Sequence, residues 1–229
     1  LGQCVQIIPH ITDEIKHRIR STSEKFGGDI TIIECGGTVG DIESLPFLEA
    51  IRQIRLEENV IDTASVHVTL VPKLDIVGEQ KTKPTQHSVQ ELRKIGIHPD
   101  IILARSSTEL VKSTRDKISL FSNVPSTHVI SLPDVKNIYS VPENLKNHGF
   151  HSVIAERLGL VIAENHEGWK QWNAIVKPFE HEEQKIRIAI GGKYVSLSDS
   201  YVSVKEAIRH AAAQLGIKPE ITFIDTEKV

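Results

Sequence analysis

The chain has 229 residues, of which 27 are Lys or Arg and 30 are Asp or Glu, and its formal net charge is −3. This length allows one large domain, or one domain with part of another. The balanced charge argues against a general nucleic-acid binder. We expect no membrane span, because no apolar run reaches about 18 residues, and no signal-peptide pattern opens the sequence.

The cysteine and methionine usage points to a cytoplasmic protein seen in part. Cys4 and Cys35 lie far apart and form no C-x-x-C pair, which is typical of a cytosolic chain with reduced thiols. Methionine is absent, and a complete gene product should start with one. We therefore expect Leu1 not to be the natural start, and the chain to be a fragment.

Short β-branched runs alternate with helical segments along the first 160 residues. The runs predict four strands, at 29–34, 65–72, 99–106 and 127–134. Between them the pattern predicts helices at 45–58, 88–96 and 112–123, the second with Ser88 and Glu91 in capping-box spacing. Strands that alternate with helices predict an α/β domain, with a mostly parallel sheet covered by helices on both faces.

The pattern changes after about residue 160. The segment 161–184 contains both tryptophans and many charges, and it predicts a short helix and an interdomain linker. A strand near 185–194, a helix at 198–216 and a strand at 220–229 then predict a β-α-β unit that opens a second domain.

Ligands of parallel sheets bind at the carboxyl ends of the strands. The first predicted strand ends at Glu34 and is followed by GGTVGDIES, an acidic glycine loop without a P-loop pattern. Glu34 could hold Mg²⁺ or simply cap the strand. Asp41 and Glu43 could bind a ribose or base, or merely start the next helix, whose dipole favours acids there.

The second predicted strand is followed by KTKPTQHS, the basic counterpart of that loop. Lys81 and Lys83 flank Thr82, and Pro84 can start a helix whose free N–H groups favour an anion. Thr85, Gln86 and Ser88 add neutral donors. The segment suits a triphosphate, and the alternative is a solvated lysine pair at a helix start.

Other candidates have weaker patterns. Lys117 and Phe121 are four residues apart on a predicted helix and could hold a phosphate and a base, although such a Phe is more often core and such a Lys exposed. Cys35 has no nearby His to activate it as a nucleophile. His67 alternates within a strand and fits a packed or surface residue better than a metal ligand.

Several long stretches together resemble the CTP synthase family. They include IIECGGTVGDIESLPFLEAIRQ, GEQKTKPTQHSVQELRKIGIHPDIILARS, VISLPDVKNIYSVPENL and GGKYVSLSDSYVSVKEAIRHA. Their order and spacing agree over nearly the whole chain, and only the stretch around Trp169 and Trp172 matches weakly.

The resemblance implies a ligase that makes CTP from UTP, ATP and glutamine, with Mg²⁺ as cofactor. ATP phosphorylates O4 of the uracil, and ammonia from a glutaminase domain then displaces the phosphate. The fold implied is a P-loop-NTPase-like three-layer synthase domain followed by a class I glutamine amidotransferase domain. CTP is implied as feedback inhibitor, and a homotetramer with nucleotide sites at subunit interfaces as the assembly.

Site residues follow from the same resemblance, position by position. Glu34 is similar to a Mg²⁺ ligand, and Asp41, Ile42 and Glu43 are similar to part of the CTP pyrimidine site. The grip on the UTP or CTP triphosphate corresponds to Lys81, Thr82, Lys83, Pro84, Thr85, Gln86 and Lys117, with Phe121 near the nucleoside. The ATP pocket corresponds to Pro133, Asp134 and Val135, with Arg105 as a weaker phosphate contact.

Three features of the family are missing from the sequence. Its P-loop with the catalytic lysine and second Mg²⁺ acid should lie upstream of Leu1, and its glutaminase Cys-His-Glu triad downstream of Val229. We therefore expect residues 1–160 to be an incomplete synthase domain, 161–184 a linker and 185–229 the start of a glutaminase domain, with no catalytic residue present. The alternative is a non-catalytic nucleotide-sensing or assembly module that keeps the CTP site.

Overall fold

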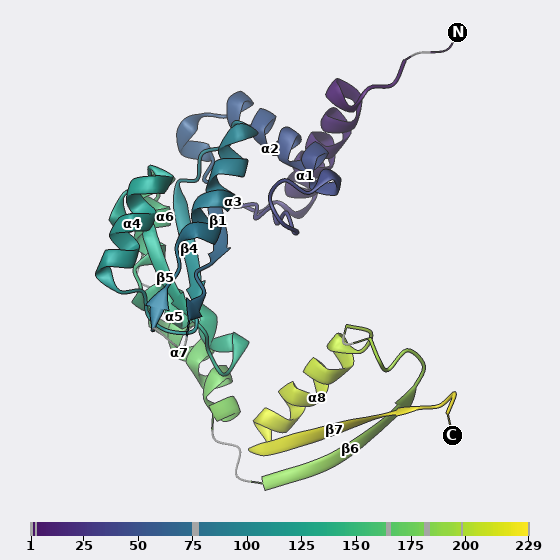
Figure 1. Ribbon diagram of the computed structural model, residues 1–229. Helices are drawn as coiled ribbons and strands as arrows, with labels where there is room; N and C mark the ends of the chain where they lie inside the picture. The colour runs from purple at the N-terminus through teal and green to yellow at the C-terminus, as the bar shows by residue number, and fades with distance from the viewer. Residues whose placement is uncertain are drawn as a thin grey trace. The chain divides into compact units, whose positions relative to one another are not determined.

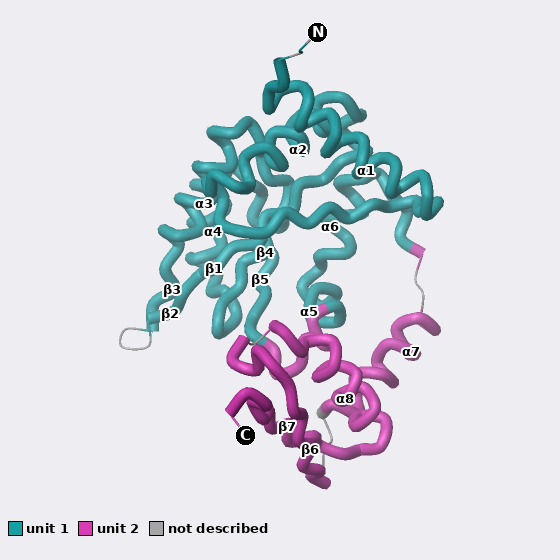
Figure 2. The backbone as a smooth tube through the Cα atoms, turned by 90° about the vertical axis from the view of Figure 1, so that its right-hand side faces the viewer, with its two compact units in different colours: residues 1–134, 142–162 teal, residues 135–141, 163–229 magenta. Residues whose placement is uncertain are grey.

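The computed structural model of the protein describes residues 2, 4–74, 78–163, 166–180, 184–197 and 199–228. The chain divides into two compact units, which are coloured separately in Figure 2. Unit 1 contains residues 1–134 and 142–162, and unit 2 contains residues 135–141 and 163–229.

A parallel sheet of three strands forms the centre of unit 1. Its strands are β1 (Val66–Leu70), β4 (Ile101–Ser106) and β5 (Val129–Pro133), in the order β1-β4-β5. Val68 pairs with Leu103, and Leu103 pairs with Ile130, so the three strands end at the same edge. Three of the four predicted strands of this region are thereby confirmed.

Helices cover both faces of this sheet (Figure 1). On one face, Ile102 and Ala104 pack with Val89 of α3 (Lys83–Lys94) and Ile118 of α4 (Lys112–Ser122). On the other face, a cluster forms from Ile101, Leu103 and Ile130 with Leu145 of α5 (Val141–Asn147) and Phe150, Val153 and Ile154 of α6 (Phe150–Arg157). Alternate residues of β4 thus pack into two separate cores, one on each face of the sheet. The predicted three-layer arrangement is confirmed.

The predicted strand at 29–34 is wrong. This segment has no strand geometry, and Ile32 is 90% exposed. β-branched composition makes a segment suitable for a sheet, but a strand also needs a neighbour that pairs with its backbone. No neighbour among the described residues does so.

Two helices precede and follow this segment. α1 (Thr12–Phe26), which the sequence pattern did not reveal, packs on α2 (Leu45–Glu57), which it did. Lys16 and Arg20 of α1 join Glu57 at the end of α2, with N–O distances of 2.6 and 2.9 Å. Short helical turns complete the region, at Ile7–Ile11, Ile42–Ser44 and Val60–Asp62.

The segment after β1 forms a small hairpin and then enters α3. The hairpin strands are β2 (Lys73–Leu74) and β3 (Glu79–Gln80), which the sequence analysis did not predict. α3 begins at Lys83 rather than at Ser88, so the capping-box start was wrong and the helix start at Pro84 was right. Pro fits the first turn because its missing N–H has no intrahelical partner there. The predicted end near Gly96 is confirmed, with Gly96 at φ +94°.

Unit 2 contains the β-α-β unit expected from the sequence. β6 (Gln184–Gly192) pairs in parallel with β7 (Ile217–Asp225), and α8 (Val202–Gln214) connects them. α7 (His166–Val176) supplies the short helix predicted before it, and short turns of unit 2 lie at Ile138–Ser140 and Lys177–Glu180. The short turn at Ser126–His128 belongs to unit 1. No helix in the described part of the chain is long and apolar enough to cross a membrane.

Candidate functional site

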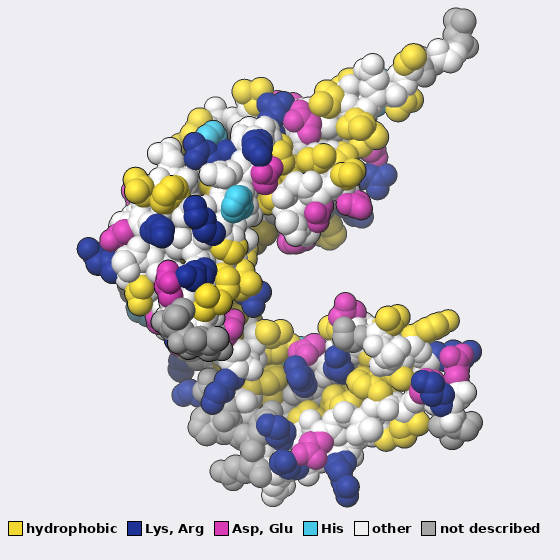
Figure 3. Space-filling model, viewed as in Figure 1, with side chains coloured by type: hydrophobic (Ala, Val, Ile, Leu, Met, Phe, Trp, Pro, Cys, Tyr) yellow, Lys and Arg dark blue, Asp and Glu magenta, His cyan; other side chains and the backbone are white. Residues whose placement is uncertain are grey.

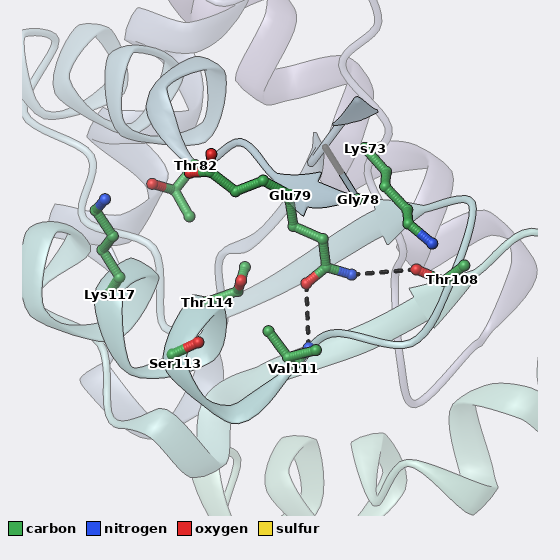
Figure 4. A pocket seen from close by; sticks show the side chains of 10 residues that line it. Lys73, Gly78, Glu79, Thr82, Thr108, Val111, Ser113, Thr114 and Lys117 are labelled. Atoms are coloured by element: carbon green, nitrogen blue, oxygen red, sulfur yellow. Dashed lines mark hydrogen bonds between the residues drawn. The ribbon is translucent and has the colours of Figure 1, made fainter. Parts of the chain in front are cut away.

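A cavity of about 310 Å³ lies where the hairpin, α3 and α4 meet at the carboxyl edge of the sheet (Figure 4). Most of the residues that line it are polar, and they include two lysines and one glutamate. The lining comprises Lys73, Gly78, Glu79, Gln80, Thr82, Thr108, Val111, Ser113, Thr114 and Lys117. The cavity therefore brings Thr82 and Lys117, predicted separately from the sequence, into one place.

The amines around this cavity suit an anion. Lys73 and Lys117 form no ion pair with any described residue, whereas Lys81 pairs with Glu79 at 2.6 Å. That hydrogen bond from Lys81, with the nearby positive charge of Lys117, lowers the pKa of Glu79. Figure 3 shows Lys and Arg side chains gathered over the face formed by α3 and α4. An incoming phosphate would compete with Glu79 for Lys81 and meet Lys117 without such competition.

The neutral residues of the lysine segment are largely committed to the fold. Thr85 is fully buried, and its Oγ1 lies 3.3 Å from Thr69 Oγ1 and donates to the carbonyl of Leu70. Gln86 is 3% exposed and donates to Thr82 Oγ1 at 2.9 Å. Their side chains thus hold the start of α3 against β1, and what the segment offers a ligand is Lys81, Lys83 and the backbone of the helix start.

Of the ten residues that line the cavity, only Thr82 and Lys117 were predicted from the sequence. The polar residues that were missed include Lys73, Gln80, Thr108, Ser113 and Thr114. Thr114 is 7% exposed, and its hydroxyl bonds to no other described residue, so it is available to a ligand. Thr108 could have been found, because it closely follows the end of β4, where the strand-end rule places ligand contacts. Lys73 could not, since its position depends on the hairpin.

Phe121 and Lys117 have different surroundings on α4. Lys117 lines the cavity, whereas Phe121 does not; Phe121 is 45% exposed, and Lys83 Nζ lies 5.9 Å from its ring centroid. The cation–π contact joins α3 to α4. A nucleoside near Phe121 would have to share the ring with Lys83.

The acidic glycine loop lines a second cavity of about 310 Å³ between α1 and α2. Glu34, Asp41 and Glu43 lie on its lining, beside apolar residues of the two helices. Gly37 and Gly40 have φ of +87° and +104°, which L side chains rarely adopt, so the loop needs glycine there. Asp41 accepts a hydrogen bond from the N–H of Thr38 at 3.2 Å, so one of its carboxylate oxygens already has a partner within the loop.

Glu34 fits one ligand of a hard cation. Its carboxylate is exposed, lies beside Gly36 and bonds to no other described residue. Mg²⁺ takes one or two carboxylates and completes its shell with water and substrate phosphates. No cluster of three or more His, Cys, Asp or Glu side chains occurs among the described residues, so this part of the chain offers Glu34 as a single ligand.

Cys35 and His67 are structural. Burial, and to a lesser extent the charge of Glu34, raises the pKa of the Cys35 thiol, which opposes a nucleophilic thiolate. His67 is buried, which lowers its pKa, and its Nε2 lies 2.9 Å from Ser88 Oγ. Of the two alternatives expected for His67, a packed or a surface residue, the structure shows the packed one.

The two parts of the predicted nucleotide site lie at opposite ends of α3. The lysine segment forms the start of the helix, whereas Cys35 and Val39 of the glycine loop pack against Leu92 near its end. A Cβ added to Gly40 would lie 4.0 Å from Glu91. Lys83 and Glu91 are separated by roughly 12 Å along a helix axis, so the two parts do not form one pocket here.

The predicted ATP residues lie at the ends of β4 and β5. Arg105 and Asp134 approach each other with an N–O distance of 3.7 Å, and both side chains are more than half exposed. The N–H of Asp134 donates to the carbonyl of Ser106, which extends the sheet edge past Pro133. Val135 belongs to unit 2.

The family model described as CTP synthase N-terminus matches residues 1–160. The chain belongs to the CTP synthase family. The CTP synthases of Pyrococcus abyssi and Sulfurisphaera tokodaii are 52% and 50% identical to it over its whole length. That of Carboxydothermus hydrogenoformans is 48% identical over 99% of the chain.

The chain spans about 42% of the length of these curated CTP synthases. The similarity continues past residue 160 to the end of the chain, so unit 2 is covered by these relatives as well as unit 1. Membership in the CTP synthase family confirms the resemblance read from the sequence motifs.

Proposed function

We propose that the full-length protein is a CTP synthase that converts UTP to CTP with ATP and with ammonia from glutamine. ATP phosphorylates O4 of the uracil, and ammonia displaces the phosphate. Such chemistry depends mostly on positioning and on charge neutralisation by Mg²⁺ and lysine. The reaction belongs to pyrimidine nucleotide synthesis, and the relatives named CTP synthase support it.

The observation that carries the proposal is the basic cavity at the start of α3 and α4. Lys73 of the hairpin and Lys117 of α4 line it, and neither has a carboxylate within ion-pair distance among the described residues. Lys81, just before the start of α3, pairs with the lining residue Glu79. A triphosphate of UTP or CTP satisfies several amines at once, which a single carboxylate cannot. Thr82, Thr114 and the N–H groups of the helix starts would complete the contacts.

The remaining roles follow the family motif. Glu34 would hold Mg²⁺ at the phosphates, and Asp41, Ile42 and Glu43 would contact the pyrimidine of CTP. Pro133, Asp134, Val135 and Arg105 would line the ATP pocket. Lys83, Pro84, Thr85 and Gln86 would shape the triphosphate site, with Phe121 near the nucleoside.

We further propose a homotetramer whose nucleotide sites lie between subunits. Support comes from the separation of the acidic and basic parts along α3, because a second copy could bring one subunit's glycine loop to another's lysine segment. A full-length protein that sediments as a monomer while fully active would contradict this assembly. The 229-residue chain alone should make no CTP.

Replacement of Lys81 by Ala in the full-length protein tests the triphosphate site. Hydrogen bonds to charged groups contribute about 1.5–3 kcal/mol each, so Lys81→Ala should raise the KM for UTP at least about tenfold. The measurement is the initial rate of CTP formation against UTP concentration, at saturating ATP and glutamine.

Lys94→Ala is the matched control. Lys94 stands at the far end of α3 and pairs with Glu91 at 2.7 Å, on an exposed surface. Its removal should leave the KM for UTP unchanged. An unchanged KM in both variants would remove the triphosphate assignment.

A further inference from the structure

The side chain of Gln80 is buried at the base of the basic cavity, with 8% of the residue exposed. Its Nε2 donates to the carbonyl of Glu109 at 2.7 Å and lies 3.3 Å from Thr108 Oγ1. Its Oε1 accepts from the backbone N–H of Val111 at 3.1 Å. Dashed lines in Figure 4 mark the bonds that reach Thr108 and Val111.

The backbone partners fix the orientation of this amide. A peptide N–H can only donate and a carbonyl oxygen can only accept, so Oε1 must face Val111 and Nε2 must face Glu109. One side chain thus bonds to both ends of a three-residue stretch. A hydrocarbon side chain of the same size could make neither bond.

These bonds connect the two elements that carry the lysines of the cavity. Gln80 is paired with Lys73 in the hairpin, and the next residue, Lys81, donates its N–H to the carbonyl of Pro72 at 2.8 Å. Val111 is the N-cap residue of α4, the helix that carries Lys117. The Gln80 amide therefore determines how closely the start of α4 lies to the lysine segment.

We propose that Gln80 is a positioning residue for the nucleotide triphosphate: its carboxamide holds the start of α4 so that Lys117 and Lys81 bind the same phosphate chain. This inference rests on the proposed function. Gln80 itself need not touch the ligand. Its effect runs through Lys117, which stands on α4 and lines the cavity.

Replacement of Gln80 by Met in the full-length protein removes the hydrogen bonds and keeps most of the volume. The core of α4 stays anchored by Ile118, which is fully buried, so the fold should persist. Loss of two or three hydrogen bonds, partly replaced by water, should raise the KM for UTP about three- to tenfold. The kcat should change less than twofold.

Ser119→Ala is the matched control for a general loss of helix stability. Ser119 Oγ donates to the carbonyl of Val124 at 2.7 Å, near the other end of α4. Both variants should lower the melting temperature, but Ser119→Ala should leave the KM for UTP unchanged. An equal rise of the KM in both variants would mean that Gln80 acts only through stability, and it would overturn the proposal.

A double-mutant cycle with Lys117→Ala separates this inference from the proposed function. If Gln80 acts by placing Lys117, then Gln80→Met should have less than a twofold further effect when Lys117 is already Ala. Two outcomes would overturn the positioning role but not the triphosphate site. One is that the effects of Gln80→Met and Lys117→Ala on the KM are independent. The other is that Gln80→Met leaves the KM unchanged while Lys117→Ala raises it. If Lys81→Ala and Lys117→Ala both leave the KM unchanged, the triphosphate site itself is wrong.

Discussion

At the scale of single residues, the lysine segment shows what a sequence pattern can and cannot assign. The pattern placed KTKPTQ at the ligand edge of the sheet, and the cavity beside Thr82 and Lys117 lies there. The sequence could not divide the segment into buried and free side chains. Thr85 and Gln86 resemble ligand donors as a string of letters, but tertiary packing turns both inward.

Lys73 and Gln80 show the opposite case. Neither was predicted, because their roles depend on a two-residue hairpin whose strands are too short to give a periodic signal. The exposed carboxylates of the glycine loop lie between these two cases in how well they could be predicted. They lie beside a cavity, but the strand-end rule does not account for this, because the strand that was expected before Glu34 did not form.

Glu43 provides a prediction at this scale. Glu43 is exposed on the lining of the glycine-loop cavity. If its carboxylate accepts hydrogen bonds from the pyrimidine nucleoside, Glu43→Ala should raise the CTP concentration for half-inhibition about tenfold. The KM for ATP should change less than twofold.

The measurement is the rate of CTP formation at several CTP and ATP concentrations. Glu24→Gln, which removes an exposed carboxylate on α1, should leave both values unchanged. Equal losses in CTP inhibition and in ATP binding by Glu43→Ala would count against the pyrimidine role.

At the scale of elements, the alternation of strands and helices was predictable, because three buried strands and two of the helices between them have strong local periodicity. α1, α5 and α6 were missed, and the strand at 29–34 was placed wrongly. Whether these helices form, and whether 29–34 forms a strand, depends on partners far along the chain. α6 is held in part by Arg157, whose Nε donates to Asp100 at 2.8 Å, and no local pattern predicts that pair.

Asp100 joins three elements of unit 1. Its carboxylate also accepts from Arg55 of α2 at 2.8 Å and from the N–H of Ser65, before β1, at 2.7 Å. Burial raises the pKa of Asp100, but the hydrogen bonds from Arg55, Ser65 and Arg157 outweigh burial, so the net pKa lies below its ordinary 3.8. The charged form is therefore stabilised in the folded state.

Asp100→Ala should lower the free energy of unfolding by about 3 kcal/mol at pH 7, because it leaves two partly buried guanidinium groups without their carboxylate. The pKa is depressed on folding, so this stabilisation is complete above the ordinary pKa and is lost as pH falls through the folded-state value. The difference between wild type and variant should therefore shrink below about pH 4.

Urea unfolding of the 229-residue chain from pH 7 to pH 3 measures this difference. Arg18→Ala is the control, since Arg18 and Glu14 form an exposed pair on α1 and should contribute less than about 0.5 kcal/mol. A pH-independent difference for Asp100→Ala would contradict the ionic role of Asp100.

At the scale of the whole molecule, the chain forms two compact units. It spans about 42% of the length of its curated relatives. The family could be recognised from the sequence because its motifs are long and specific. The sequence could not show that the acidic loop and the lysine segment lie at opposite ends of α3 and form no single pocket within the described residues.

The most direct measurement is product formation by the full-length protein given UTP, ATP, Mg²⁺ and glutamine. A CTP synthase is expected to release CTP, ADP and phosphate in equal amounts, with ammonium able to replace glutamine. A protein that binds UTP and CTP but forms no CTP and consumes no ATP would contradict this function. It would instead support a non-catalytic module that senses nucleotides.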